Sequence, residues 1–165
     1  MTKKIVITGG LGYIGTELCK IYSGISWNNE ILVIDNRFIS ERVNQLRNWN
    51  IDFVHGDILD KDLVDKYCKD ADVVHHLAGI TDVPRIKSES NNDADTKIKL
   101  VAEKGTQNLL NAISDKCKII FPSTHVVYEG IEKVKNNILE DEQTKPILSY
   151  ATSKAINEKQ LKNSG

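Results

Sequence analysis

The chain opens with a pattern that few folds can accommodate: a β-branched strand, a glycine-rich turn and a helix follow one another without a break. The predicted strand covers Ile5–Thr8, the glycines Gly9, Gly12 and Gly15 recur every three residues, and the helical pattern continues to Tyr22. Such a turn directs free backbone N–H groups and the positive end of a helix dipole at one point. That point suits a pyrophosphate, so the sequence predicts a dinucleotide site here.

The next predicted strand adds a second signal, because it ends in a carboxylate. Ile31–Asp35 is apolar until its last residue, which lies twenty positions after Gly15. A carboxylate there accepts hydrogen bonds from the hydroxyls of an adenosine ribose and repels a 2′-phosphate, which favours NAD over NADP. Arg37 is close enough in sequence to weaken that preference. A simpler alternative is that Asp35 only begins a turn with Asn36.

Length and composition exclude several classes of function. A chain of 165 residues with 27% charged residues is typical of one globular domain, here residues 1–165. A net charge of −1 gives no reason to expect nucleic acid or an anionic membrane as a partner. The three cysteines are far apart and the four histidines lack metal-site spacing, so we expect reduced thiols, no metal and a cytoplasmic location.

Strand and helix patterns alternate along the chain. The predicted strands are Ile5–Thr8, Ile31–Asp35, Ile51–His55, Val73–Leu77 and Lys118–Phe121, and the predicted helices are Gly12–Tyr22, Ser40–Asn48, Asp60–Cys68, Asp93–Ile113 and Tyr150–Leu161. This alternation predicts an α/β fold with a doubly wound parallel sheet, Rossmann-like, in which right-handed crossovers give the strand order 3-2-1-4-5. The fifth strand would then be an edge, so we expect a truncated chain, a fragment or half of an assembly.

Local signals refine the expected boundaries. Ser40 is the expected N-cap of its helix, and the aspartates around Asp60 suit the positive end of the next helix dipole. A polar loop is expected from Glu129 to Pro146. The candidate core positions of the long fourth helix are Ile98, Val101, Ala102, Leu109 and Ala112.

The last predicted helix carries a second candidate site. Tyr150 and Lys154 are four residues apart, so they share one face of the helix. A nearby ammonium favours the phenolate, which makes such a pair a general acid or base near neutral pH. The spacing alone is weak, because a solvated helix face carries it equally well. Its place after the fifth strand favours function, since ligands bind at the carboxyl ends of strands in such sheets.

Hydroxyl groups follow the fifth predicted strand. Ser123 and Thr124 leave the strand at the edge where ligands bind, so either hydroxyl can hold a substrate oxygen. Both residues are also common turn formers. Tyr128, a few residues later, has the spacing of a buried aromatic side chain.

These motifs, taken in order, resemble the N-terminal, NAD-binding part of the extended short-chain dehydrogenase/reductase family, in its nucleotide-sugar epimerase/dehydratase group. The resemblance runs from Thr8 to Glu158, nearly the whole chain. Several motifs in the right order are specific, although each one alone is not. The resemblance rests on Thr8–Gly15, Val33–Asn36, Gly56–Ile58, His76–Gly79, Gly105–Leu110, Ser123–Thr124 with Val127–Tyr128, and the pair Tyr150 and Lys154.

The resemblance implies a role for each motif along a bound NAD. The turn residues would hold the pyrophosphate, the residues after the second strand the adenosine ribose, those after the third strand the adenine, and those after the fourth strand would line the rest of the cofactor. In that order, these residues are Gly9, Gly12, Tyr13, Ile14 and Gly15; Asp35 and Asn36; Asp57 and Ile58; and Leu77, Ala78 and Gly79.

The resemblance also implies a catalytic group of Thr124, Tyr150 and Lys154. Lys154 would bind the nicotinamide ribose and tune Tyr150, the acid or base, while Thr124 would orient a substrate hydroxyl. In such enzymes a sugar carbon gives hydride to the bound NAD as the tyrosine takes the hydroxyl proton. The cofactor supplies the redox chemistry, and the protein supplies orientation and electrostatics.

Departures from the family pattern narrow this function. Dehydratases of the family carry an Asp-Glu pair directly after the threonine, where this chain has His125 and Val126, so an epimerase or a ketone reductase fits better than a dehydratase. The other departures are Thr81 in place of a lysine, Ala102 in place of an asparagine, and Glu129 inserted before a glycine. The family's C-terminal substrate domain is also absent from this sequence.

Two hypotheses from different classes follow. The first is an NAD-dependent nucleotide-sugar epimerase, and the second is a non-catalytic dinucleotide-binding module. The resemblance further implies a homodimer formed by the long helix and the tyrosine-bearing helix. The charged residues of the long helix, which can equally be its solvated face, are Lys97, Lys99, Glu103 and Lys104.

Overall fold

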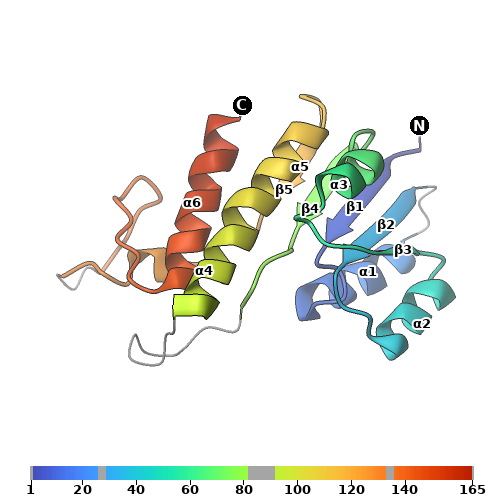
Figure 1. Ribbon diagram of the computed structural model, residues 1–165, viewed down its shortest axis with the longest axis horizontal. Helices are drawn as coiled ribbons and strands as arrows, with labels where there is room; N and C mark the ends of the chain where they lie inside the picture. The colour runs from blue at the N-terminus through green and yellow to red at the C-terminus, as the bar shows by residue number, and fades with distance from the viewer. Residues whose placement is uncertain (1, 26–28, 82–91, 133–135, 165) are drawn as a thin grey trace. The chain divides into compact units, whose positions relative to one another are not determined.

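The computed structural model describes residues 2–25, 29–81, 92–132 and 136–164. The chain forms two compact units (Figure 1). Unit 1 consists of Met1–Gly79 and Gly105–Pro122, and unit 2 consists of Ile80–Lys104 and Ser123–Gly165. Each unit carries one of the two candidate sites.

Unit 1 is built on a five-stranded sheet with the order β3-β2-β1-β4-β5, and every neighbouring pair is parallel. The predicted fold class and strand order are therefore confirmed. Strand β5 lies at one edge, and Ile120 within it is 40% exposed. The strands are β1 (Lys4–Thr8), β2 (Glu30–Asp35), β3 (Asp52–His55), β4 (Val73–His76) and β5 (Lys118–Ile120).

Two adjacent histidines of β4 show that helices cover both faces of this sheet. Successive side chains of a strand point to opposite faces. The His75 ring shares a hydrogen bond with the hydroxyl of Tyr22 in α1 (Tyr13–Ser23), whereas the His76 ring shares one with Thr106 in α5 (Thr106–Ala112). Helices α1 and α5 therefore lie on opposite faces, as a doubly wound sheet requires.

The sequence signals at two helix starts have different outcomes. Asp60 caps α3 (Lys61–Cys68), because its carboxylate accepts hydrogen bonds from the amides of Asp62 and Leu63. The expectation that Ser40 caps α2 (Ser40–Asn48) is wrong. Ile39 takes the extended N-cap position and its carbonyl accepts the first helical bond, from Val43, so Ser40 is already helical.

The main core of unit 1 lies between the sheet and the two helices that follow β1 and β2. All three cysteines are free, and Cys19 and Cys68 are buried. Burial raises the pKa of both thiols to about 12, so they act as small apolar side chains rather than nucleophiles. The core cluster consists of Ile5, Ile7, Leu11, Cys19, Val33, Val43, Leu46 and Ile51.

The long fourth helix has the predicted extent, but it is not a single α-helix. It consists of α4 (Asn92–Leu100), a π-helix (Val101–Gly105) and α5. Of the predicted core positions, Ile98, Ala102 and Leu109 are buried, whereas Val101 and Ala112 are only half-buried. A π-helix has one residue more per turn than an α-helix, and hydrophobic periodicity does not reveal such a turn in advance.

Unit 2 pairs α4 with the last helix, α6 (Ser149–Asn163), which also contacts a short 3₁₀-helix, His125–Tyr128. Asn157 of α6 donates a hydrogen bond to the Ala102 carbonyl at 2.9 Å, and Gln160 donates one to the Glu103 carbonyl at 3.0 Å. Both carbonyls belong to the π-helix, so α6 satisfies acceptors at that turn. The predicted polar loop contains no helix or strand in its described part, and residues 133–135 lie outside the described residues.

Candidate functional site

The glycine-rich turn is fixed by steric limits that only glycine meets at Gly9. This residue has a φ of +68°, and a Cβ atom there would lie 2.7 Å from the backbone nitrogen of Ala78. Its amide donates a hydrogen bond to the Ile34 carbonyl at 2.7 Å. Gly9 therefore allows the end of β1 to pass close to the ends of both neighbouring strands.

The start of α1 leaves backbone donors for a ligand. The first helical bond runs from the Thr16 amide to the Gly12 carbonyl at 3.0 Å, and the N-cap Gly12 has no side chain to cap the helix. The amides of Tyr13, Ile14 and Gly15 precede that bond, so the helix itself provides no acceptor for them. The Tyr13 and Ile14 side chains are 83% and 61% exposed, which leaves this helix end accessible.

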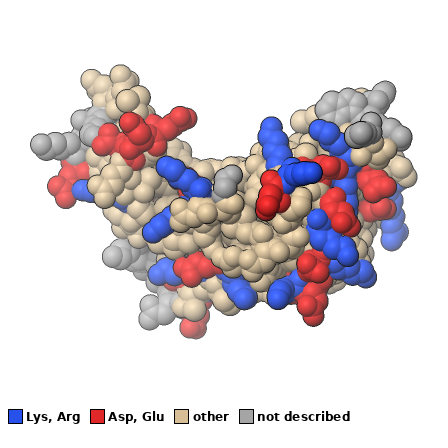
Figure 2. All heavy atoms as spheres, turned by 90° about the horizontal axis from the view of Figure 1, so that it is seen from above, with Lys and Arg blue, Asp and Glu red and all other residues tan. Residues whose placement is uncertain are grey.

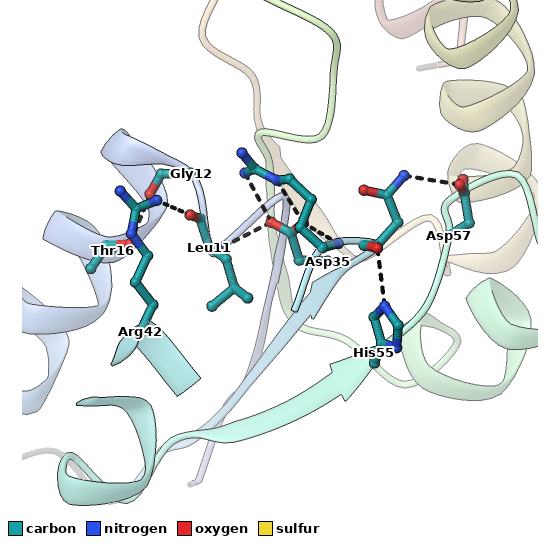
Figure 3. Close-up of polar contacts among 9 residues, drawn as sticks. Leu11, Gly12, Thr16, Asp35, Arg42, His55 and Asp57 are labelled. Carbon is teal, nitrogen blue, oxygen red and sulfur yellow. Dashed lines mark hydrogen bonds and ion pairs between the residues drawn. The ribbon is translucent and has the colours of Figure 1, made fainter. Parts of the chain in front are cut away.

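Asp35 is buried at the end of β2 and is bonded directly to the glycine-rich turn (Figure 3). Its Oδ2 accepts a hydrogen bond from the Leu11 amide at 2.9 Å, and its Oδ1 accepts one from the Arg37 amide at 2.9 Å. The Arg37 guanidinium also contacts both carboxylate oxygens, at 3.3 and 3.5 Å. The alternative that Asp35 only begins a turn with Asn36 does not account for its bond to Leu11.

A second arginine contacts the backbone of the same residue, Leu11. Arg42 of α2 donates a hydrogen bond to the Leu11 carbonyl (Figure 3). The Leu11 amide and carbonyl are therefore both used, by Asp35 and Arg42. This pair of contacts fixes the orientation of the turn before any ligand binds.

The predicted adenine-binding residues are also tied together. The Asn36 side chain donates a hydrogen bond to Asp57 at 3.0 Å, and the His55 ring bonds to the Asn36 carbonyl at 3.0 Å (Figure 3). The other carboxylate oxygen of Asp57 accepts from the Leu59 amide. Ile58 is buried with its side chain against Gly105, and its carbonyl accepts a hydrogen bond from the Asn108 side chain at 3.0 Å, so both are used within unit 1.

The end of β4 is held by a buried hydrogen-bond network. The His76 ring shares hydrogen bonds with Thr8 at 3.0 Å and Thr106 at 2.9 Å, and the Ala78 amide donates to the Thr8 hydroxyl at 3.3 Å. Leu77 and Ala78 are half-buried and Gly79 is exposed. A Cβ atom at Gly79 would meet nothing within 4 Å, so this glycine borders open space.

In unit 2, Thr124 caps the 3₁₀-helix. Its Oγ1 accepts a hydrogen bond from the Val126 amide at 3.3 Å. The hydroxyl proton has no acceptor among the described residues. A half-buried hydroxyl with a proton still to donate suits the orientation of a ligand oxygen.

Tyr150 and Lys154 lie together in the first turns of α6. The Lys154 Nζ lies 5.8 Å from the centre of the Tyr150 ring, within the range of a cation–π contact. Burial lowers the pKa of Lys154, and the Glu158 carboxylate one turn later opposes that shift. Ser123 donates a hydrogen bond to Glu158, so its hydroxyl proton is used within unit 2.

Glu129 is a site residue whose role the sequence does not reveal. Its Oε1 accepts hydrogen bonds from the amides of Ile147 and Leu148 at 2.7 and 2.6 Å, immediately before α6. The backbone of Gly130 and Lys145 pairs beside it, with a bond of 2.9 Å. The only sequence signal was the presence of Glu129 where the family has a glycine.

The described residues show neither a metal cluster nor a membrane span. None of their His, Cys, Asp and Glu side chains forms a group of three or more that could hold a metal ion. In the same part of the chain, no helix is both long and apolar enough to cross a membrane. Lys and Arg are interspersed with Asp and Glu on the face that Figure 2 shows.

Known proteins match nearly the whole chain. The model of the 3-beta hydroxysteroid dehydrogenase/isomerase family matches residues 6–165. The chain is 35% identical to CDP-paratose 2-epimerase of Salmonella typhi, over 86% of this chain and 42% of that protein. It is 31% identical to dTDP-D-glucose 4,6-dehydratase of Dictyostelium discoideum, over 93% of this chain and 38% of that protein.

A solved structure agrees with this match. UDP-glucose 4-epimerase from Brucella ovis, crystallised in complex with NAD, superimposes with a TM-score of 0.78 at 30% sequence identity. The superposition covers 98% of this chain and 47% of that chain. The chain therefore spans less than half the length of these three proteins.

Proposed function

Because the chain belongs to the 3-beta hydroxysteroid dehydrogenase/isomerase family, and its relatives include nucleotide-sugar epimerases and dehydratases, we propose that it is the NAD-binding part of a nucleotide-sugar epimerase. The observation that carries the proposal is the bond between Asp35 and the Leu11 amide. It joins a carboxylate suited to a ribose to a turn suited to a pyrophosphate.

The residues of unit 1 fit NAD along the length of its adenosine and pyrophosphate. The amides at the start of α1 would bind the pyrophosphate, and Asp35 with Asn36 would hold the ribose. Asp57 and the Ile58 amide would bind the adenine edge. Leu77, Ala78 and Gly79 would line the path beyond, where Gly79 borders open space.

The residues of unit 2 fit the protein's share of the chemistry. Bound NAD would supply the hydride acceptor. Tyr150 would take the proton from a sugar hydroxyl, and the Lys154 ammonium would favour its phenolate. Thr124 would donate a hydrogen bond to the same substrate oxygen and keep its own proton, and Lys154 would also hold the nicotinamide ribose.

The residues after Thr124 favour an epimerase over a dehydratase. Elimination of water needs a further acid and base, which dehydratases of the family place directly after the threonine. This chain has His125 and Val126 there, in the first turn of the 3₁₀-helix. A ketone reductase of the same family has the same requirement for Thr124 and Tyr150, so these two residues do not separate it from an epimerase.

We also infer a cytoplasmic setting and a homodimer. The three free cysteines support the first inference, which cell fractionation tests. The second involves α4 and α6, as in the family. The charged residues Lys97, Lys99, Glu103 and Lys104 are exposed on the α4 and π-helix segment. Sedimentation of a monomer alone at high concentration contradicts the dimer.

The test combines NAD calorimetry with turnover assays on UDP-glucose and CDP-linked sugars. We expect NAD to bind the chain, and Tyr150→Phe to leave NAD affinity unchanged while lowering turnover by about 10²- to 10⁴-fold. Tyr67→Phe, on α3 and outside both sites, serves as the matched control. Absence of NAD binding contradicts the proposal. NAD binding without turnover favours a non-catalytic binding module, provided that turnover is still absent when a substrate domain of the family is fused to the chain.

A further inference from the structure

The carboxylate of Asp35 has its full complement of hydrogen-bond donors before any cofactor binds. A carboxylate offers about four lone-pair positions on its two oxygens. Two are filled by the backbone amides of Leu11 and Arg37, each at 2.9 Å. The other two are filled by the Arg37 guanidinium, through Nε at 3.3 Å and Nη2 at 3.5 Å.

These four donors are not equally firm. The two amides belong to the glycine-rich turn and to the backbone after β2, so they stay in place when a ligand arrives. The guanidinium contacts are longer, and the Arg37 side chain is 56% exposed while that of Asp35 is 3% exposed. Because the Arg37 side chain is largely exposed, water competes for its contacts with Asp35, so the guanidinium is the donor that a ligand can displace.

The guanidinium also lies where a ribose would approach Asp35. A Cβ atom at Gly12 would be 3.7 Å from the Arg37 Nη2, so this nitrogen lies beside the first turn of α1. The other cation nearby, Arg42, is bonded to the Leu11 carbonyl, and Asn36 is bonded to Asp57. Arg37 is therefore the cation best placed to respond to the substituent on the ribose.

We propose that Arg37 is a specificity-determining residue that lets the adenosine site accept a 2′-phosphate as well as a free 2′-hydroxyl. The proposal rests on the dinucleotide site proposed above. The hydroxyls of an NAD ribose must displace the guanidinium to reach Asp35, so Arg37 weakens NAD binding. A 2′-phosphate instead gains a planar, bidentate donor, and the same cation offsets the negative charge of Asp35.

Arg37 changes the expected preference for NAD over NADP. A buried carboxylate at the end of β2 would exclude NADP if it faced the ribose alone. In this chain the carboxylate and a guanidinium lie together, and they have opposite effects on a 2′-phosphate. The site should therefore discriminate between the two cofactors much less than Asp35 alone predicts.

Adenosine fragments isolate this effect from the rest of the cofactor. Calorimetry compares 5′-AMP with adenosine 2′,5′-bisphosphate, and NAD is measured in parallel. We expect Arg37→Ala to bind 5′-AMP about two- to fivefold more tightly, because a competing ion pair is lost. The same variant should bind the bisphosphate about tenfold more weakly, because a charge-assisted contact is lost.

Two further variants separate this role from general charge and from misfolding. Arg47→Ala removes another exposed arginine, in the last turn of α2, and should leave the ratio of the two affinities unchanged. Arg37→Lys keeps the charge without the planar donor pair, so it should show a smaller loss for the bisphosphate. Thermal unfolding of each variant establishes that it is folded.

The outcomes distinguish this inference from the proposed function. Binding of NAD with an affinity ratio that Arg37→Ala leaves unchanged overturns the role of Arg37 alone. Binding of NAD and 5′-AMP with no detectable binding of the bisphosphate does the same. If the wild-type chain binds neither NAD nor 5′-AMP, the dinucleotide site itself is wrong, and the role of Arg37 fails with it.

Discussion

The carboxylate of Glu129 accepts a hydrogen bond of 2.6 Å from the Leu148 amide, nineteen residues later and immediately before α6. The neighbouring Ile147 amide donates to the same oxygen. Helix α6 carries Tyr150 two residues further on. A negative charge at this end of a helix also interacts favourably with its dipole. An inserted acidic residue thus fixes the point at which the candidate catalytic helix begins.

We therefore predict that Glu129 matters for stability through its acceptor oxygen more than through its charge. Glu129→Ala should lower the free energy of unfolding by about 1–2 kcal/mol, because two amides lose their acceptor. Glu129→Gln keeps an oxygen acceptor and should lose less. Urea unfolding measures both, with Glu132→Ala as an exposed control nearby. Equal stability of the wild type and Glu129→Ala contradicts the prediction.

Gly9 and Gly79 should respond differently to the same substitution. Gly9→Ala forces a left-handed backbone on alanine and places its Cβ against the Ala78 backbone, so we expect a loss of about 2 kcal/mol or more. Gly79→Ala has open space, and we expect a change within about 0.5 kcal/mol. Chemical denaturation compares the two. A similar cost at both positions would show that steric exclusion is not the cause.

The His75 imidazole should make the protein less stable in weak acid. Burial lowers the pKa of His75 below its usual value of 6.5, so the unfolded chain binds a proton that the folded chain does not. Stability is therefore full above pH 6.5 and falls as the pH drops from 6.5 toward the lower folded pKa. We expect His75→Gln to reduce the slope of unfolding free energy against pH in this window.

Tyr22→Phe is the matched variant for His75. It removes the hydroxyl that shares a 2.7 Å hydrogen bond with the His75 ring but keeps the histidine. We expect it to lower stability by about 1–3 kcal/mol at neutral pH, because a buried ring nitrogen loses its partner. The acid dependence should remain. If His75→Gln and wild type have parallel profiles of unfolding free energy against pH just below pH 6.5, another group causes the acid effect.

Asn157 should contribute to stability through the π-helix. Its side chain is buried and donates to the Ala102 carbonyl, so Asn157→Leu leaves that carbonyl without this donor. We expect a loss of about 1–3 kcal/mol in urea unfolding, whereas Lys159→Ala, on an exposed position of the same helix, should change little. An unchanged free energy of unfolding in Asn157→Leu would contradict this prediction and indicate that water replaces the lost donor.

The strands and their order could be predicted because each signal was local and repeated. The β-branched runs, the glycine spacing and the carboxylate of Asp35 all agree with one topology, and the dinucleotide-type motif favours its strand order among those that right-handed crossovers allow. The predicted glycine turn after β1 is likewise found, with Gly9 in the left-handed conformation that a tight turn permits.

Other features depend on contacts between residues far apart in the sequence. The role of Glu129 depends on amides eighteen and nineteen residues later, and that of Ser123 on Glu158, 35 residues away. The contacts of the Arg37 guanidinium depend on its rotamer, which sequence spacing does not determine. Ser40 lost its expected cap position because Ile39 extends the backbone one residue earlier.

The π-helix has a consequence for the apolar pattern of the long helix. Its wide turn takes up one residue more than an α-helical turn, so the helical repeat before Val101 and the repeat after Gly105 differ in phase by one residue. Before this turn, α4 packs against α6 within unit 2; after it, α5 packs against α3 within unit 1. An amphipathic period must therefore be counted separately on each side of the π-helix.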